Sequence, residues 1–310
     1  MALIIHHNPE IKGQVMHLKP EVVEQLERVL SSVEQLLPKA IEPIDWTKIS
    51  AANWRRHSFA GYLEPIESIE ATHLDDLVGI DRQKQVLENN TRQFLRGYPA
   101  NNVLLWGSRG TGKSSVVRAL LNKYADQGLR IVQVDKHDLE HLPDIFAQIS
   151  KQPYRYIILS DDLSFEVDDP GYKILKSVLD GSVYASPGNV LIYVTSNRRH
   201  LLPEFHTDNL GAKMIHNEIH HGEAVEEKIS LSDRFGLWLS FYVFKQDLYL
   251  EIVQKTIARL CIEHQVEPQW DDELARAAVK WSHEKSKRCG RTALQFARHW
   301  LGQYLLKEEG

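Results

Sequence analysis

A glycine-rich octapeptide constrains this chain more than any other feature: Gly107-Ser108-Arg109-Gly110-Thr111-Gly112-Lys113-Ser114. It follows the apolar run Val103–Trp106 and precedes a helical pattern over residues 113–127. Backbone N–H groups converge on phosphate oxygens only where side chains are small and φ is free, hence three glycines. The N-terminus of the following helix adds unpaired N–H groups and a positive dipole end. All eight residues are therefore predicted to bind a nucleotide, with Lys113 on the β- and γ-phosphates and the Ser114 hydroxyl in an Mg²⁺ shell.

Strand-like and helix-like patterns alternate around this loop. The apolar runs are 103–106, 131–134, 156–159, 190–194 and 237–244, and the helical patterns are 81–96, 113–127, 138–149 and 172–179. Near-continuous apolar strands separated by helices indicate a parallel sheet with helices on both faces. After residue 245 only helical patterns remain, at 246–264, 271–285 and 291–307. We therefore predict an α/β fold, with an αβα sheet domain over 74–245 and a helical lid over 246–310.

The first 73 residues are predicted to be an arm of different character. Residues 20–37 carry apolar side chains at helical spacing, and Pro38 ends that pattern. Residues 38–73 read as irregular, with prolines and scattered aromatic side chains. The string Trp54-Arg55-Arg56-His57 fits docking of a partner or simple packing, and both readings stay open.

Composition excludes several classes of protein. The chain has 310 residues, a net charge of −5 and two cysteines, Cys261 and Cys289. Two cysteines cannot form a disulfide framework, and the charge disfavours a strongly basic nucleic-acid binder, although it allows a local basic patch. The apolar runs are too short to cross a membrane, and the N-terminus lacks the features of a signal peptide. We expect a reduced, cytoplasmic protein.

Two carboxylates end the apolar run at 156–159. Asp161 and Asp162 follow it directly, and in a phosphate-loop nucleotidase the first carboxylate binds Mg²⁺ through water. The second would orient or deprotonate the attacking water. The competing interpretation is a solvated acidic loop, because Glu166, Asp168 and Asp169 follow closely.

Further motifs give the chain a family resemblance. The run at 190–194 is followed by Thr-Ser-Asn-Arg-Arg-His at 195–200, and Asp-Asp-Leu-Ser-Phe-Glu stands at 161–166. Leu-Ser-Asp-Arg-Phe-Gly occupies 231–236, and Cys-Gly-Arg-Thr at 289–292 opens the last helix. With these residues the chain resembles an AAA+ ATPase, most closely the uncharacterised bacterial family of AAA+ ATP-binding proteins that carries the first two strings.

This resemblance implies roles for individual residues. Lys113 and Ser114 correspond to Walker A, and Asp161 and Asp162 to Walker B. Asn197 corresponds to sensor 1, which positions the lytic water, and Arg291 to sensor 2 on the lid. Arg234 corresponds to the arginine finger that reaches the ATP of a neighbouring subunit, with Arg198 and Arg199 as alternatives.

The sequence departs from the family pattern in two places. The second Walker B residue is usually Glu, and Asp162 is one methylene shorter, which implies slow turnover or switch-like behaviour. Residues 135–140 also lack the aromatic-hydrophobic-Gly pore loop of threading unfoldases, so processive unfolding is disfavoured.

Two weaker signals remain. His216 and His220 have the spacing of a helical metal site, with Glu218 and Glu223 nearby, but an exposed insertion facing a partner is the favoured reading. The end of the lid is locally basic, which fits a solvated helix face or nucleic-acid contact. Its basic residues are Arg276, Lys280, Lys285, Lys287, Arg288, Arg291 and Arg298.

The sequence thus predicts an ATP- and Mg²⁺-dependent AAA+ ATPase, a homo-oligomer that remodels a protein or nucleoprotein partner. Two alternatives are a nucleotide-gated binding module with little hydrolysis and a DNA-associated loader.

Overall fold

The structure is a computed structural model that describes residues 22–25, 27–28, 43–57, 60–165, 169–181, 186–199, 201, 213–215, 218–220 and 231–308. The chain divides into two compact units, residues 1–43 with 56–60, and residues 44–55 with 61–310. Residues 22–25, 27 and 28 are helical, as predicted, and the rest of the predicted helix over 20–37 lies outside the described residues.

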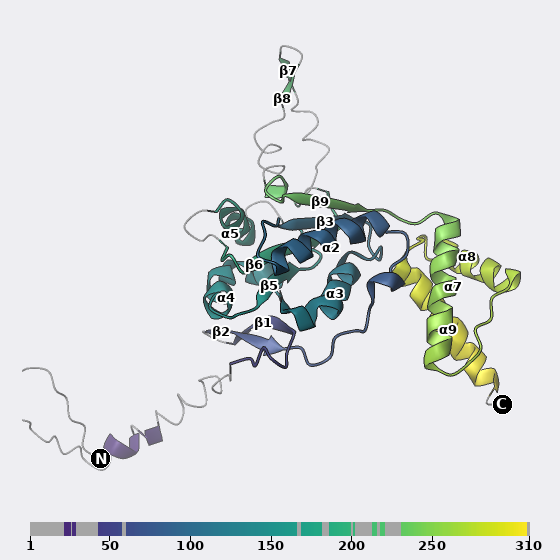
Figure 1. Cartoon of the computed structure of the whole chain (residues 1–310), viewed down its shortest axis with the longest axis horizontal. Coiled ribbons are helices and arrows are strands. Elements are labelled where there is room, and N and C mark those ends of the chain that lie inside the picture. The colour runs from purple at the N-terminus through teal and green to yellow at the C-terminus, as the bar shows by residue number, and fades with distance from the viewer. Residues whose placement is uncertain are drawn as a thin grey trace, which may run out of the picture. The chain divides into compact units, whose positions relative to one another are not determined.

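A seven-stranded sheet forms the centre of the larger unit (Figure 1). Its order is β2 (Ala60–Pro65), β1 (Ala51–His57), β4 (Leu129–Gln133), β5 (Arg155–Ser160), β6 (Val190–Ser196), β3 (Val103–Gly107) and β9 (Leu237–Phe241). The pairs β1–β4, β4–β5, β5–β6, β6–β3 and β3–β9 are all parallel. All five predicted strands are present, although the last ends at Phe241 rather than at residue 244. The phosphate loop therefore follows a strand with a parallel neighbour on each side.

The prediction that residues 38–73 are irregular is wrong for residues 51–57 and 60–65, which form β1 and β2. The β1 sequence, Ala-Ala-Asn-Trp-Arg-Arg-His, has no β-branched residue and no apolar run. Pairing with β4 positions it, and its small residues Ala51 and Ala52 are buried against the core. Trp54 is also buried and belongs to that core, which settles its part of the docking-or-packing question in favour of packing.

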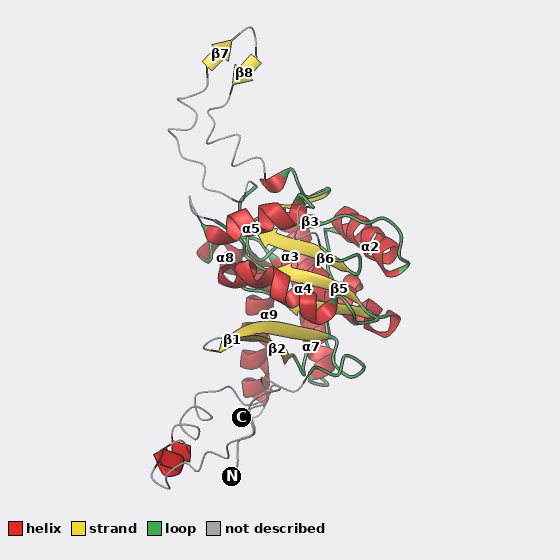
Figure 2. Cartoon of the chain, turned by 90° about the vertical axis from the view of Figure 1, so that its left-hand side faces the viewer, coloured by secondary structure: helices red, strands yellow, loops and turns green. Residues whose placement is uncertain are grey.

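Helices cover both faces of the sheet, as predicted (Figure 2). Helices α2 (Asp81–Leu95) and α3 (Lys113–Tyr124) contribute to one core cluster, and α4 (Leu142–Ile149) and α5 (Pro170–Leu179) to the other. Strand β3 supplies Val103 and Leu105 to the first cluster and Leu104 to the second, as the alternation of a strand requires. The helix predicted over 138–149 is divided: a 3₁₀ helix covers Lys136–His141 before α4 begins.

Three helices follow the sheet: α7 (Gln246–Glu263), α8 (Asp272–Glu284) and α9 (Gly290–Glu308). Their apolar residues belong to the same cluster as those of α2 and α3, so the lid shares a core with one face of the sheet. Strands β7 (Lys213–Ile215) and β8 (Glu218–His220) form a separate two-stranded antiparallel pair. None of the helices within the described ranges is long and apolar enough to span a bilayer.

Candidate nucleotide-binding site

The phosphate loop has backbone geometry that only glycine satisfies. Gly107 has a φ of +128°, and a Cβ there would lie 2.0 Å from the carbonyl oxygen of Phe241 on the neighbouring strand. Gly110 has a φ of +78°, and a Cβ would lie 2.7 Å from Cys289 Sγ on the lid. These close approaches leave a backbone cradle that fits a phosphate, as the glycine spacing predicts.

Lys113, at the start of α3, is buried with only 7% of its surface exposed. Its Nζ donates hydrogen bonds to the carbonyl oxygens of Gly107 and Ser108, both at 2.8 Å, and to Asn197 Oδ1 at 3.2 Å. Burial lowers the pKa of this ammonium to about 8, against the opposing charges of Asp161 and Asp162. A buried cation held only by neutral acceptors at short range is well prepared to receive an anion.

Asp161 accepts hydrogen bonds from hydroxyl groups of two other elements. Ser114 donates from α3 to Asp161 Oδ1 at 2.5 Å, and Thr195 donates from the end of β6 to the same oxygen. Carboxylate and hydroxyl oxygens are the hard ligands that Mg²⁺ takes, usually together with several waters. The donor set at Ser114 and Asp161 therefore fits a hydrated Mg²⁺ beside the loop.

Asp162 has an unusual conformation and two side-chain partners. Its φ of +54° lies in the left-handed region, where non-glycine residues are uncommon. Its Oδ1 accepts from Asn197 Nδ2, and its Oδ2 accepts from Arg109 NH2 at 2.9 Å. Its backbone N–H donates to Thr195 Oγ1 at 2.9 Å, which helps to hold this conformation. The structure thus brings the predicted Asp162 and Asn197 into contact.

The chain segments at the ends of β5 and β6, residues 161–165 and 195–199, are joined by hydrogen bonds. Leu163 donates its N–H to the Thr195 carbonyl at 2.7 Å, and Ser196 Oγ donates to the Leu163 carbonyl at 2.7 Å. Leu163 and Phe165 are fully buried, and Phe165 N–H donates to the Leu201 carbonyl at 2.9 Å. The spacing of both strings therefore serves to fix the carboxylates and Asn197 at one edge of the sheet.

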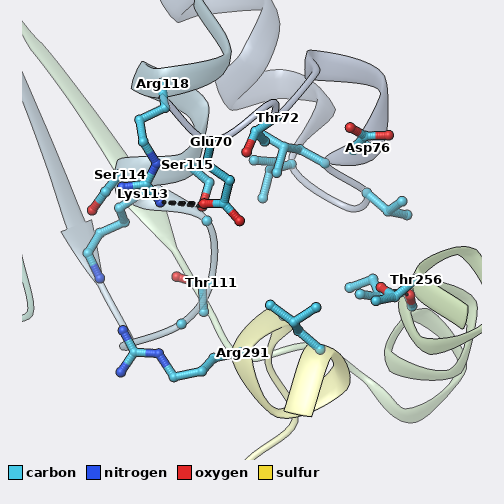
Figure 3. A pocket seen from close by; sticks show the side chains of 18 of the residues that line it. Glu70, Thr72, Asp76, Thr111, Lys113, Ser114, Ser115, Arg118, Thr256 and Arg291 are labelled. Carbon is cyan, nitrogen blue, oxygen red and sulfur yellow. Dashed lines mark hydrogen bonds and ion pairs between the residues drawn. The ribbon is translucent and has the colours of Figure 1, made fainter. Parts of the chain in front are cut away.

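The loop opens onto a cleft of about 910 Å³ between the sheet, the segment before α2 and the lid. Figure 3 shows Arg291 extending from α9 toward the side of the loop where Lys113 lies, with Thr256 of α7 across the cleft. The cleft's far part is lined by apolar side chains of a kind that suits a base. These are Leu77, Val78, Ile80, Phe244, Ile252, Ile262 and Leu294.

The sequence assigned no role to Thr195 or to the apolar lining. Thr195 belongs to the polar string at the carboxyl end of the fourth apolar run, where ligands bind in parallel sheets, but nothing in the sequence pairs its hydroxyl with Asp161. The segment 77–80 gave no comparable signal, because its short apolar stretch lies outside any regular element.

The predicted arginines occupy different places. Arg291 lines the cleft, its N–H donates to the Gly110 carbonyl at 3.3 Å, and its charge contributes to lowering the pKa of Lys113. Arg234 does not line the cleft and forms an ion pair with Asp180 at the end of α5. Arg199 lies over the Trp106 ring, with 5.6 Å between the guanidinium carbon and the ring centroid.

The predicted metal ligands near the insertion are only partly described. His216 and Glu223 lie outside the described residues, while Glu218 and His220 belong to β8. The helical spacing considered for the two histidines is therefore wrong, because Glu218–His220 is a strand. Within the part of the chain that the structure describes, no group of three or more His, Cys, Asp and Glu side chains could hold a metal ion.

Comparison with known proteins places the chain in a family. Residues 47–304 match the family described as "Protein of unknown function (DUF815)". The chain belongs to that family. It is also 27% identical over 185 residues to the replication factor C large subunit of Nanoarchaeum equitans (strain Kin4-M). That match covers 56% of this chain and 43% of the relative, so the chain spans less than half of the relative's length.

Solved structures show the same fold. A point mutant of Thermotoga maritima RuvB superimposes with a TM-score of 0.52 at 17% identity, covering 76% of this chain and 67% of that one. The T. maritima RuvB Holliday junction branch migration motor gives 0.48 at 18% identity, covering 73% and 63%. The match with a TM-score of 0.52 shows the AAA+ fold that the motifs of this chain predict.

Proposed function

We propose that this protein is an Mg²⁺- and ATP-dependent AAA+ ATPase that couples ATP binding and hydrolysis to remodelling of a protein or nucleoprotein partner. One observation carries the proposal: the loop lysine, both carboxylates, Asn197 and Arg291 converge on one cleft from four separate segments of the chain. A structural glycine turn would not need a buried lysine, a carboxylate bridged by two hydroxyls or a lid arginine at the same place.

Each residue has a role that its position supports. The loop N–H groups and Lys113 bind and neutralise the β- and γ-phosphates of the substrate. Asn197 and Asp162, in contact with each other, orient a water molecule, and Asp162 accepts its proton. Arg291 reaches the phosphates from the lid, so that lid position depends on the nucleotide. Mg²⁺, held near Ser114 and Asp161, would neutralise charge that develops on the phosphate oxygens.

We further propose that Arg234 acts on the site of a neighbouring copy. Arg234 does not line its own cleft, which supports a role outside its own subunit, and its ion pair with Asp180 would have to open for that role. Such a finger contributes a factor of about 10³–10⁵ in rate, so turnover per subunit would rise with protein concentration.

A mixing experiment tests this role. Lys113→Ala retains the finger and lacks a working site, whereas Arg234→Ala retains the site and lacks the finger. Each variant alone is expected to release almost no phosphate from ATP. An equal mixture would recover about a quarter of wild-type turnover, because about a quarter of the interfaces pair an intact site with an intact finger. Failure to recover any activity, with both variants folded, would reject the trans role.

The second candidate is a nucleotide-gated binding module with little hydrolysis. The pairing of Asp162 with Arg109 and Asn197 favours it, because both carboxylate oxygens are already engaged. Tight ATP binding with turnover at the Lys113→Ala level, at every protein concentration, would establish this candidate.

The proposal extends to assembly, location and domain organisation. We propose a homo-oligomer in the cytoplasm, with an arm over 1–73, a sheet domain over 74–245 and a lid over 246–310, where Ala51–Pro65 of the arm joins the sheet. A loader on DNA stays an alternative, because the similar proteins include a replication factor C large subunit.

A further inference from the structure

Positive charge is concentrated in one part of the lid. Residues 274–298 contain seven Lys or Arg residues and one acidic residue, Glu284, in a chain whose net charge is −5. The rest of the chain therefore has eleven more acidic than basic residues. We call six of these cations the basic lid segment: Arg276, Lys280, Lys285, Lys287, Arg288 and Arg298. Arg291 is excluded because it lines the nucleotide cleft.

These six cations are presented to solvent without carboxylate partners. Five are exposed, and Arg288 is half-buried. Where the structure describes the lid, its ion pairs all use a cation of α7: Lys255 pairs with Glu251, and Arg259 pairs with Glu263 and with Asp76 before α2.

Arg276 and Lys280 have acidic neighbours at helical spacing on α8, with Asp272 and Glu273 before Arg276 and Glu284 after Lys280, although these form no ion pair among the described residues. The other four cations are not neutralised in this way: Lys285, Lys287 and Arg288 follow the last residue of α8, and Arg298 has no acidic residue three or four positions away in α9. The positive field is therefore strongest at these four.

Backbone geometry orders the segment. Arg276 and Lys280 are four residues apart on α8 and therefore share one face, about 6 Å apart along the axis. After α8, Ser286 adopts a φ of +52° and reverses the chain, its N–H donating to the His283 carbonyl at 2.9 Å. Lys287 N–H donates to the Ser282 carbonyl at 3.1 Å. The turn thus carries its lysines on a hydrogen-bonded backbone.

Aromatic contacts fix this turn against α9. The Trp281 ring stacks on His299, with 5.0 Å between centroids, and Lys285 Nζ lies 5.4 Å from the Trp281 centroid. Arg298 precedes His299 in α9, so this stacking also ties the helix that bears Arg298 to α8. The cations of two helices and a turn therefore belong to one packed structure.

We propose that the basic lid segment binds the phosphate backbone of double-stranded DNA. A DNA duplex carries one phosphate for about every 1.7 Å of axis, so cations spread over one helix and its turn can meet several phosphates. Exposed, unpaired Lys and Arg side chains supply this sequence-independent contact. The acidic remainder of the chain repels the same polyanion, which confines binding to this part of the lid.

The segment is joined directly to the nucleotide cleft. The Arg288 carbonyl accepts a hydrogen bond from Phe244 N–H at 3.0 Å, and Phe244 lines the cleft. Three residues further on, Arg291 N–H donates to the Gly110 carbonyl of the phosphate loop. Lid movement on nucleotide binding would therefore carry the DNA contact with it. This coupling rests on the proposed function, whereas DNA binding itself does not.

The test measures binding of a fluorescein-labelled duplex of about 30 base pairs by anisotropy, using the full chain without nucleotide at about 50 to 200 mM salt. The test variant combines Lys280→Gln, Lys285→Gln and Lys287→Gln, all exposed and outside the nucleotide cleft. The control combines Arg82→Gln, Lys151→Gln and Lys173→Gln, which removes the same charge from exposed positions elsewhere. We expect the test variant to weaken binding at least tenfold and to reduce the salt slope by about 3, with the control near wild type.

Three outcomes would overturn the proposal. They are no binding at the lowest salt, equal losses in the test and control variants, and tight binding of polyglutamate without binding of DNA. The last would assign the segment to an acidic protein. The Lys113→Ala variant separates the two proposals, since it should bind DNA like wild type in the absence of nucleotide. Loss of the proposed ATPase activity would therefore leave the DNA result unaffected.

Discussion

The nucleotide cleft and the basic lid segment both present positive charge, but they are built in opposite ways. In the cleft, Lys113 is buried and its ammonium has three acceptors at fixed distances. In the lid segment, the lysines are exposed and no carboxylate pairs with them. The first arrangement suits one small anion at one position, and the second suits a long polyanion that neutralises many cations at once. A single substitution in the cleft should therefore cause a large loss of activity, whereas each substitution in the lid segment should cause only a small loss of binding.

The largest effect is expected from Lys113→Ala set against Lys280→Ala. Removing the buried ammonium takes away the cation that neutralises the transferring phosphate, so phosphate release from ATP should fall by at least about 10³-fold. Lys280→Ala removes one exposed cation outside the cleft and should leave turnover within about twofold. Steady-state phosphate release measures both variants. Comparable losses in the two would contradict the division between cleft and lid segment.

Next in size is the effect of a methyl group on the backbone cradle. Gly107→Ala would place a Cβ 2.0 Å from the Phe241 carbonyl oxygen at a φ of +128°, so β3 and β9 would have to separate. We expect the free energy of unfolding to fall by about 3 kcal/mol or more. The matched control is Gly302→Ala in α9, where no atom lies within 4 Å of the added Cβ.

The control should stabilise the fold by about 0.5–1 kcal/mol, because alanine is the better residue in a helix interior. Denaturant unfolding of both variants measures the difference. A Gly107→Ala protein as stable as wild type would show that the cradle does not need the close approach to Phe241.

This comparison also explains how far sequence reasoning could reach. The loop conformation was predictable because backbone geometry forces its residue types, and the places of Asp161 and Asn197 beside it were predictable because both residues closely follow apolar runs. The roles of these two residues stay predictions, and that of Asn197 rests on the family resemblance. The order of the strands in the sheet could not be predicted. The contact between Thr195 and Asp161 depends on β5 and β6 being neighbours, so it could not be predicted either. β1 was missed because its stability comes from pairing with β4, which leaves no pattern in its own side chains.

The lid segment marks the other limit of sequence reasoning. Its cations were evident in the sequence, but their function was not, because a solvated helix face contains the same residue types. The absence of carboxylate partners and the ordered turn at Ser286 emerge only when the helices are placed in space. Sequence therefore identifies sites that impose a backbone conformation better than it identifies surfaces.

A smaller effect should appear in the pH dependence of nucleotide binding. Burial lowers the pKa of Lys113 to about 8, and a bound triphosphate favours the charged form and raises that pKa again. Binding therefore takes up a proton above pH 8, and the dissociation constant for ATP without Mg²⁺ should rise about tenfold per pH unit there. Below pH 7 the lysine is already charged, so Lys113 adds no further pH dependence there.

Lys113→Arg is the control for this prediction, because a guanidinium stays charged throughout the range. Titration of the side chain at position 113 should therefore not change the dissociation constant of this variant for ATP between pH 8 and pH 9.5. Titration of a fluorescent ATP analogue measures both proteins. An equal rise in the dissociation constants of both proteins would mean that another group causes the pH dependence. It would contradict the prediction that the buried Lys113 ammonium causes it.

The smallest effect is expected from Arg109→Ala. Arg109 belongs to the phosphate loop, yet its side chain is 63% exposed, and its ion pair with Asp162 Oδ2 is open to solvent. An exposed pair contributes little to stability, so the unfolding midpoint should not change measurably. If the pair restrains Asp162, its removal should raise turnover by about two- to fivefold as the carboxylate becomes available to water. Arg82→Ala on α2 controls for the lost charge. A tenfold fall instead would mean that Arg109 contacts the transferring phosphate, and Arg109 would then belong with Lys113 as a cation of the reacting site rather than as a restraint on Asp162.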